Sequence, residues 1–217
     1  MPASPYPAFR TGDYFIDVVF LGRFVPYRKN KLTSRPDQRP FRLSSAGALQ
    51  TAFRSALAKA DGVTGAHCIH ELWTRGEFAA LIEADLDLLW KSAGPTIPDW
   101  LPMRYVSWLP AAYEVAARFT ATGRGRSNVY LILLDYADRR GDDHGVYVGM
   151  SRYSPAQRFD QHKAGIRAAG CVLKRGLEVL AGPTLHLQKI ARSEAARIEA
   201  QLASALSDAG IHVEGGH

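Results

Sequence analysis

Cysteine is scarce in this chain, which has 217 residues but only Cys68 and Cys171. Two thiols are too few for the disulfide framework of a small secreted protein. Long apolar runs are lacking too, since no stretch of about 18 apolar residues is present. The first residues, "MPASPYPAFR", have neither the charged start nor the apolar core of a signal peptide. These absences predict a soluble, cytoplasmic protein that does not insert into a membrane.

Signatures of several well-known chemistries are also absent. The sequence has no Gly-rich phosphate loop of the Walker type and no Ser-His-Asp signature. The segment "HCIHE" at residues 67–71 brings two histidines close to a cysteine. As a strand it would point His67 and His70 to opposite faces, and no second pair of ligands follows at a recognisable distance. A zinc site is therefore not expected there.

Positive charge, in contrast, is concentrated near the N-terminus. The chain has a net charge of +6, and residues 1–60 hold ten Lys or Arg against three Asp or Glu. In "GRFVPYRKNKLTSRPDQRPFR" the cations are interleaved with aromatic residues, which suits a phosphate backbone and its bases. We expect Arg28, Lys29 and Lys31 to bind nucleic acid. The alternative is a solvated loop without a partner, and this stretch alone does not separate the two.

The N-terminal part of the chain predicts a mixed α/β region over residues 1–120. The Gly/Arg-rich loop "TATGRGRSN" marks the boundary to a second domain over residues 127–217. The elements expected before this boundary are a strand within Tyr14–Val25, a helix from Ser44 or Ser45 to Ala60, an amphipathic helix ending at Gly94, an extended connector rich in proline, and a short helix over 111–119.

The C-terminal part predicts a hairpin followed by helices. An apolar strand, Val129–Asp135, and a second strand over 146–150 are joined by polar residues, which favours antiparallel pairing. Ser154 and Pro155 then open a helix, with serine at the cap and proline in the first turn. The later elements expected are a helical piece over 171–180, a strand over 184–190, a helix over 193–210 and a short strand over 211–217. The expected fold class is α/β (α+β), with a small central antiparallel sheet flanked by helices.

Four motifs follow one another in this second domain. A tyrosine lies in the first strand, "YVG" in the second strand, an arginine and a histidine four residues apart in the next helix, and a glutamate in the last helix. In this order the motifs resemble the GIY-YIG nuclease family, over residues 127–217. The resemblance implies a Mg²⁺-dependent endonuclease that hydrolyses phosphodiester bonds. The catalytic residues it implies are Tyr130, Tyr147, Arg158, His162 and Glu199.

These residue types suit phosphodiester hydrolysis on physical grounds. Tyr130 and Tyr147 lie side by side if both point to one face of the paired strands. Arg158 and His162 share one face of a helix because they are four positions apart. A guanidinium binds phosphate oxygens and stabilises the charge that develops on them. A phenol or an imidazole can take a proton from the attacking water, although a phenol with a pKa of about 10 needs a neighbouring charge to do so.

The resemblance also implies that Tyr130 activates the water and that a glutamate binds the metal ion. The expected ion is Mg²⁺, and Mn²⁺ is the expected substitute. Glu194 lies in the first turn of the last helix, where a carboxylate favours the helix dipole, so we assign it as a cap. Glu199 lies among apolar residues, where a metal site explains it, so we assign it as the ligand. Arg152 and Lys163 are expected on a solvated face that also meets phosphate.

Two features depart from the family pattern. Asn128 replaces the leading glycine of the first motif, and no asparagine follows the glutamate. Either His217 supplies a different polar group for that role, or the role is absent. The expected partner is double-stranded DNA. A nuclease acting on RNA or on branched DNA, and a nucleic-acid-binding module that keeps the fold without catalysis, remain as alternatives. No motif in the sequence indicates an oligomeric state.

Overall fold

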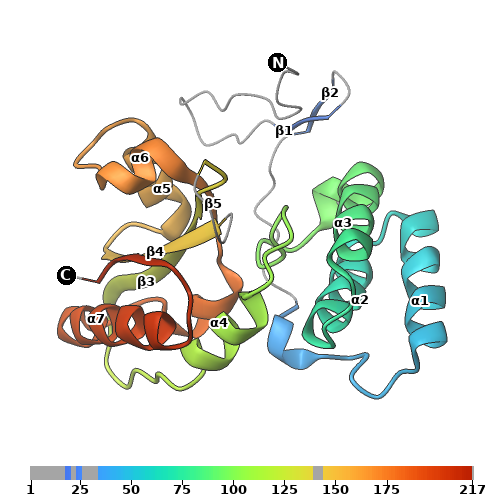
Figure 1. The fold of residues 1–217 in the computed structure, drawn as a ribbon, viewed down its shortest axis with the longest axis horizontal. Coiled ribbons are helices and arrows are strands. Elements are labelled where there is room, and N and C mark those ends of the chain that lie inside the picture. The colour runs from blue at the N-terminus through green and yellow to red at the C-terminus, as the bar shows by residue number, and fades with distance from the viewer. Residues whose placement is uncertain (1–17, 21–22, 26–33, 139–143, 217) are drawn as a thin grey trace. The chain divides into compact units, whose positions relative to one another are not determined.

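The computed structural model shows a mixed α/β chain that divides into two compact units, Met1–Pro98 and Asp99–His217 (Figure 1). It describes residues 18–20, 23–25, 34–138 and 144–216. Among these residues, no helix is long and apolar enough to cross a membrane. Both units contain helices and strands, in agreement with the mixed class that the sequence predicts.

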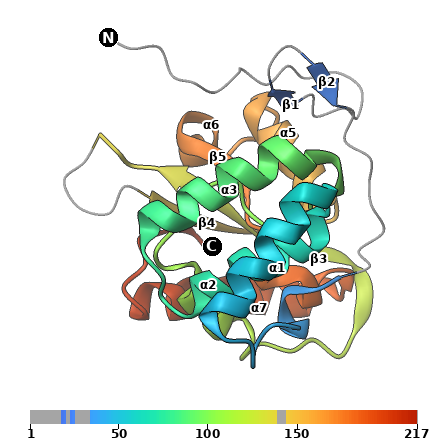
Figure 2. The ribbon, with the colours of Figure 1, turned by 90° about the vertical axis from the view of Figure 1, so that its right-hand side faces the viewer.

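Three helices form the body of the first unit, and Figures 1 and 2 show them packed side by side. They are α1 (Ala46–Lys59), α2 (Gly62–Thr74) and α3 (Ala79–Ala93). Ser45 caps α1 by accepting a hydrogen bond from the N–H of Ala48, which confirms the predicted start. Gly94 follows the last residue of α3, as expected.

Shorter elements flank these helices in the sequence. A small antiparallel hairpin of β1 (Val18–Phe20) and β2 (Arg23–Val25) lies within the predicted strand segment. Single-turn 3₁₀ helices, η1 (Pro36–Gln38) and η2 (Gly94–Thr96), precede α1 and follow α3. Each unit thus contains a sheet. The sheet that positions the predicted catalytic residues is the one in the second unit.

The histidine-rich segment at 67–71 belongs to α2, so its interpretation as a strand is wrong. Residues 65–73 are all buried, and a helix buried on every side lacks the polar face that makes a helical pattern recognisable. Asp61 caps this helix by accepting from the N–H of Thr64. His67 and His70 thus share a helical face instead of opposing each other, and burial lowers the pKa of His70 to about 4.

A four-stranded sheet, in the order β5–β3–β4–β6, forms the centre of the second unit. β3 (Arg124–Asp135) and β4 (His144–Ser151) pair antiparallel, as predicted. β5 (Gly176–Val179) joins β3, also antiparallel, whereas β6 (Val213–Gly215) joins β4 in parallel. The sheet is therefore mixed, and the prediction of an antiparallel sheet is wrong at the β6 edge. The reason is that the chain crosses the whole sheet through α7 before it reaches β6, so it arrives in the direction of β4.

Helices cover both faces of this sheet (Figure 1). On one face lies α7 (Arg192–Asp208), packed against β3 and β4; on the other lie α5 (Pro155–Lys163) and α6 (Gly170–Arg175). Successive residues of a strand point to opposite faces, so even-numbered residues of β3 such as Tyr130 face α5 and α6. This alternation puts the first tyrosine and the Arg/His helix on the same side of the sheet.

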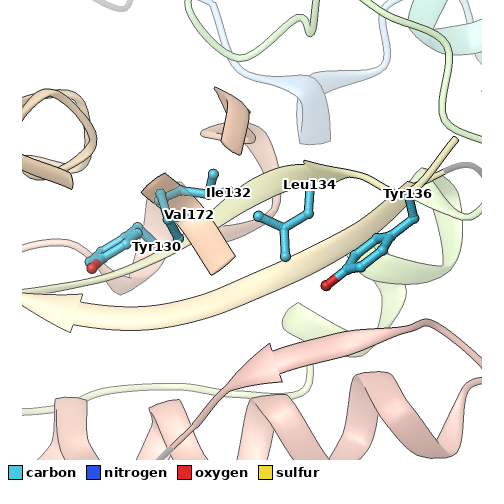
Figure 3. Close-up of a cluster of buried hydrophobic side chains, with 5 residues drawn as sticks. All are labelled: Tyr130, Ile132, Leu134, Tyr136 and Val172. Carbon is cyan, nitrogen blue, oxygen red and sulfur yellow. The ribbon is translucent and has the colours of Figure 1, made fainter. Parts of the chain in front are cut away.

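A row of buried side chains along β3 makes up the core on that side. Figure 3 shows Tyr130 at one end of the row and Tyr136 at the other, with Ile132 and Leu134 between them and Val172 of α6 against the row. Burying a large apolar side chain contributes about 1.5–3 kcal/mol. Tyr130 is only 1% exposed, so this packing fixes its ring and thereby the position of its hydroxyl group.

Three segments of the second unit differ from the prediction, the first of them because of a contact distant in sequence. The helical piece expected over 171–180 ends at Arg175, since residues 176–179 pair with β3 as β5. The strand expected over 184–190 is largely the 3₁₀ helix η3 (Gly182–Leu187), with Pro183 in its first turn. The helix α5 ends at Lys163 instead of near Ala168.

The division between the units falls before residue 99, whereas the sequence places the boundary in the loop over 120–128. Residues 99–120 pack within the second unit. There, α4 (Leu109–Ala116) packs on α7 and η3. The guanidinium of Arg104 and the N–H of Met103 both donate to the Glu178 carboxylate of β5, at 3.1 and 2.9 Å. The proline-rich connector over 94–110 is thus divided, with residues 99–110 in this unit and residues 94–98 in the first.

Candidate active site

Three of the predicted catalytic side chains meet on the α5 side of the sheet. The hydroxyl oxygen of Tyr130 lies 3.2 Å from Nε2 of His162. The ring of Tyr147 lies edge-on to that of His162, with 5.6 Å between centroids, and its centroid lies 6.2 Å from that of Tyr130. Tyr130 and Tyr147 come from paired strands and His162 from α5, as the sequence predicts.

Gly149 provides the space between the two phenols. It lies opposite Tyr130 in the β3–β4 ladder. A Cβ atom at this position would lie 2.6 Å from the Tyr130 hydroxyl oxygen and 2.6 Å from Cε1 of Tyr147, well inside van der Waals contact. The glycine of "YVG" is therefore required by the two tyrosines themselves, not by a turn.

The imidazole of His162 is oriented by the backbone. The N–H of Ala169 donates to its Nδ1 at 2.9 Å. Burial, and then the positive charge of Arg158, lower the pKa of His162 to about 4, so the ring is neutral near pH 7. A neutral ring whose Nδ1 accepts a hydrogen bond carries its proton on Nε2. His162 therefore donates to Tyr130, and Tyr130 directs its own hydroxyl proton away from the imidazole.

Burial raises the pKa of both tyrosines, Tyr130 the more strongly. The negative charge of Glu199 acts in the same direction on each of them, whereas the positive charge of Arg158 opposes the rise. Both phenols are consequently protonated near pH 7 in this state. A further positive charge beside them would be needed to give either one the character of a base.

Arg158 lies one helical turn before His162 on α5, in agreement with the spacing. Its guanidinium donates to the carbonyl oxygens of Ile166 at 3.1 Å and Arg167 at 2.7 Å, and to the side chain of Gln161 at 3.1 Å. It thus holds the loop after α5 in place. To bind a phosphate, the guanidinium would have to exchange some of these oxygens for phosphate oxygens.

Glu199 reaches the site from α7, around the edge of β4. The N–H of Val146 on that edge donates to the carbonyl of His212, and β6 ends at Gly215, opposite Val148. The next N–H on the same edge, that of Met150, donates to Oε1 of Glu199 at 3.0 Å. The carboxylate therefore takes the place that another residue of β6 would occupy. This position explains why Glu199 is only 9% exposed although its flank of α7 is otherwise apolar.

A single buried carboxylate fits a hard divalent cation. Mg²⁺ commonly uses one or two carboxylates and keeps several waters, whereas zinc needs several nitrogen, sulfur or oxygen ligands from the protein. Within the described ranges, no three His, Cys, Asp or Glu side chains gather at one point. The donor set around Glu199 thus suits Mg²⁺ or Mn²⁺ better than zinc.

Glu194 lies in the first turn of α7, as predicted, but its hydrogen bonds go to the loop before β3. Its carboxylate accepts hydrogen bonds from the N–H groups of Thr122 and Gly123, at 3.0 and 2.8 Å. These two hydrogen bonds are the main reason why its pKa lies below the ordinary value. Glu194 therefore anchors the loop before β3 to α7, which leaves Glu199 as the carboxylate at the site.

Two residues that the sequence did not single out for this role position the site. Asn128 donates through its amide to the carbonyls of Ser151 and Tyr153, at 3.3 and 2.9 Å, and accepts from the N–H of Lys189 at 3.0 Å. It ties the segment between β4 and α5 to the start of β3. The only sequence signal for this role of Asn128 is the presence of an amide side chain at the start of an apolar strand. Ala169 acts through its backbone N–H and gives no sequence signal.

The predicted nucleic-acid-binding residues fall into two groups. Arg152 is exposed, and its guanidinium donates to the hydroxyl of Tyr153 at 3.2 Å. Lys163 is also exposed, but its ammonium donates to the carbonyls of Leu173 and Gly176, at 3.3 and 3.1 Å. The remaining predicted residues lie outside the described part of the chain; they are Arg28, Lys29 and Lys31, and His217 likewise.

Comparisons with known proteins add no identification. No family model matches the chain, and neither a curated protein nor a solved structure matches it.

Proposed function

We propose that this protein is a Mg²⁺-dependent endonuclease that hydrolyses phosphodiester bonds in DNA, with a GIY-YIG-like catalytic domain in its second unit. The observation that carries the proposal is the meeting of Tyr130, Tyr147 and His162 around Gly149. The carboxylate of Glu199 binds the next N–H of the same strand, that of Met150. Phenol, imidazole and carboxylate groups are those that metal-assisted phosphodiester hydrolysis uses.

Tyr130 is the general base in this proposal. The Nε2–H of His162 points at its oxygen, and such a donor favours the phenolate over the phenol. Once the phenol has lost its proton to solvent, the phenolate takes one proton from a water molecule. The water oxygen then attacks phosphorus, and the bond from phosphorus to the leaving oxygen breaks. The leaving oxygen receives a proton from solvent.

Tyr147 and Arg158 support this reaction. The ring of Tyr147 packs edge-on against His162 and keeps the imidazole aimed at Tyr130. Arg158 carries the positive charge nearest the two phenols on α5, where its charge opposes the effect of burial on the pKa of Tyr130. In the proposed complex its guanidinium moves from the carbonyls of Ile166 and Arg167 to phosphate oxygens, where it stabilises developing negative charge.

Glu199 would hold the Mg²⁺. When bound, the ion supplies positive charge that lowers the pKa of a nearby phenol or water and offsets charge on the phosphate. The contribution of the chain is to keep the carboxylate in place, through the hydrogen bond from Met150. A Gln at position 199 keeps an oxygen to accept that hydrogen bond but removes the negative charge.

The test is cleavage of supercoiled plasmid DNA with Mg²⁺, with EDTA in a parallel reaction. We expect nicking or cutting by the wild type, and a fall on the order of 10²- to 10⁴-fold for Tyr130→Phe, the size of a general-base contribution. Tyr136→Phe is its matched control, because Tyr136 lies in the same buried row but binds Glu214 instead of His162. Glu199→Gln should abolish cleavage, whereas Glu114→Gln on the exposed side of α4 should not.

Other results would decide between the alternatives. Unchanged cleavage by both Tyr130→Phe and Glu199→Gln would contradict the assigned roles. Cleavage of RNA but not of DNA would change the substrate and keep the mechanism. A wild type that leaves plasmid and RNA intact, yet binds them with an affinity that falls steeply with salt, is a nucleic-acid-binding module and not an enzyme.

A further inference from the structure

A cavity of about 480 Å³ lies at the first residues of β3, on the second unit. One wall is the loop that enters β3, and the other is the end of η3 with the residues that follow it. Its lining residues are Ala121, Thr122, Gly123, Arg124, Gly125, His186, Gln188, Lys189 and Ile190. None of these nine described residues is acidic, and two of them, Arg124 and Lys189, carry a positive charge.

Backbone hydrogen bonds join the two walls. The N–H of Gly125 donates to the carbonyl of Lys189, and the N–H of Ala191 donates to the carbonyl of Gly123, both at 2.9 Å. Nε2 of His186 lies 3.1 Å from the carbonyls of Ala116 and of Phe119, so the imidazole is held as a donor. The cavity is consequently preformed, and a ligand would meet fixed walls instead of ordering a loop.

One carboxylate, that of Glu194, lies against the loop wall of this cavity. It accepts the N–H groups of Thr122 and Gly123, and Arg197 interacts with it electrostatically. The helix α7 begins at Arg192, directly after the wall, but Glu194 in its first turn already occupies the positive end of the dipole, so the positive charge of the cavity comes from Arg124 and Lys189. Both of these side chains are exposed, which leaves their charges available to an anion.

The position of the cavity along β3 relates it to the candidate active site. Arg124 and Tyr130 are six residues apart on one strand, which corresponds to roughly 20 Å. One strand of B-DNA carries a phosphate per ~3.4 Å of helix axis, so roughly six phosphates span this distance. We propose that this cavity binds a phosphate of the DNA backbone at about half a helical turn from the bond that is cut. DNA bound in this way would extend from the candidate active site to the cavity, and this inference rests on the proposed nuclease function.

The experiment is to measure binding of a short fluorescein-labelled DNA duplex by the full-length protein in EDTA, over a range of salt concentrations. Arg124→Gln and Lys189→Gln should each reduce the slope of log K against log salt by about 1, and the double variant by about 2. The charge-retaining variant Arg124→Lys should keep the slope. Lys174→Gln, an exposed residue of α6 outside the cavity, is the matched control and should change the slope less than either cavity variant.

The outcomes separate this inference from the proposed function. Slopes of the two cavity variants equal to that of the wild type, or an equal loss in Lys174→Gln, would overturn the phosphate subsite. Plasmid cleavage by the wild type would then still support the nuclease. Conversely, a reduced slope in the cavity variants of a protein that cuts no plasmid would keep the subsite and remove the nuclease. A wild type that binds no duplex overturns the subsite as well.

Discussion

Gly149 lies directly opposite Tyr130 in the β3–β4 ladder, and a methyl group at position 149 would overlap the hydroxyl group of that tyrosine. Tyr147, two residues before Gly149, would collide with the same methyl group. One residue without a side chain therefore lets two phenols and one imidazole occupy the same side of a sheet. The glycine is a condition for the site and not a feature of a turn.

Gly149→Ala should consequently damage both stability and cleavage. Overpacking of a tight core costs about 1–3 kcal/mol, and the expected displacement of the Tyr130 hydroxyl should weaken its contact with His162. Urea unfolding and plasmid cleavage measure the two effects. Gly170→Ala is the control, since no heavy atom lies within 4 Å of the added methyl group, and this variant should be as stable as the wild type. Full cleavage by Gly149→Ala would show that the tyrosines are not held as described.

The hydrogen bond between Tyr130 and His162 should appear as a coupling energy. We expect Tyr130→Phe and His162→Ala together to destabilise the protein by about 1 kcal/mol less than the sum of the single variants. A double-mutant cycle from urea unfolding of the wild type and the three variants measures this energy. Strict additivity within error would mean that the two side chains do not interact.

Asn128 should be important for stability although it carries no chemistry. Asn128→Ala removes three hydrogen bonds from a buried position and leaves the carbonyls of Ser151 and Tyr153 without this donor, so we expect a loss of about 2–3 kcal/mol. Asn128→Asp keeps an acceptor for the N–H of Lys189 but places a carboxylate against two carbonyls, and it should be at least as destabilising. A urea midpoint unchanged in both variants would contradict the assigned role.

Stability should fall as the pH is lowered from about 6.5 to about 4. Burial lowers the pKa of His162 to about 4, whereas an unfolded histidine titrates at about 6.5, so the unfolded state binds more protons in this window. His70 in the first unit acts in the same direction, since burial lowers its pKa to about 4 as well. Unfolding free energies of the wild type and of His162→Gln, measured at about pH 7 and about pH 5, test this. A pH dependence equal in both proteins would contradict the contribution of His162.

Local signals in the sequence predicted those elements whose ends are set by neighbouring residues. Ser45 and Ser154 both cap the helices expected after them, and Pro155 occupies the first turn of α5. Where contacts between residues distant in the sequence determine the structure, the local sequence pattern gave a wrong prediction. Residues 176–179 form a strand because β3 offers an edge, and α2 is buried on nearly every side, so neither is apparent from local periodicity.

The candidate site likewise has features that the sequence predicts and features that depend on distant contacts. Strand pairing predicts that Tyr130 and Tyr147 lie side by side if both point to one face, and their grouping with His162 came from the order of the motifs that resembles a known family. The protonated nitrogen of His162 could not be predicted, since it depends on the backbone N–H of Ala169. The carbonyl groups that accept hydrogen bonds from Arg158 belong to a loop, and the residue types of this loop do not predict its conformation.

The hydrogen bond from Met150 to Glu199 has a consequence for how this protein behaves in a crowded solution. A strand edge with unsatisfied N–H groups is a template on which another chain can add a strand, and proteins commonly block such edges with a charged side chain. In the described part of β4, Glu199 blocks the position just past the end of β6. Loss of both its charge and its acceptor, as in Glu199→Ala, would therefore favour edge-to-edge self-association, a fault that Glu199→Gln avoids.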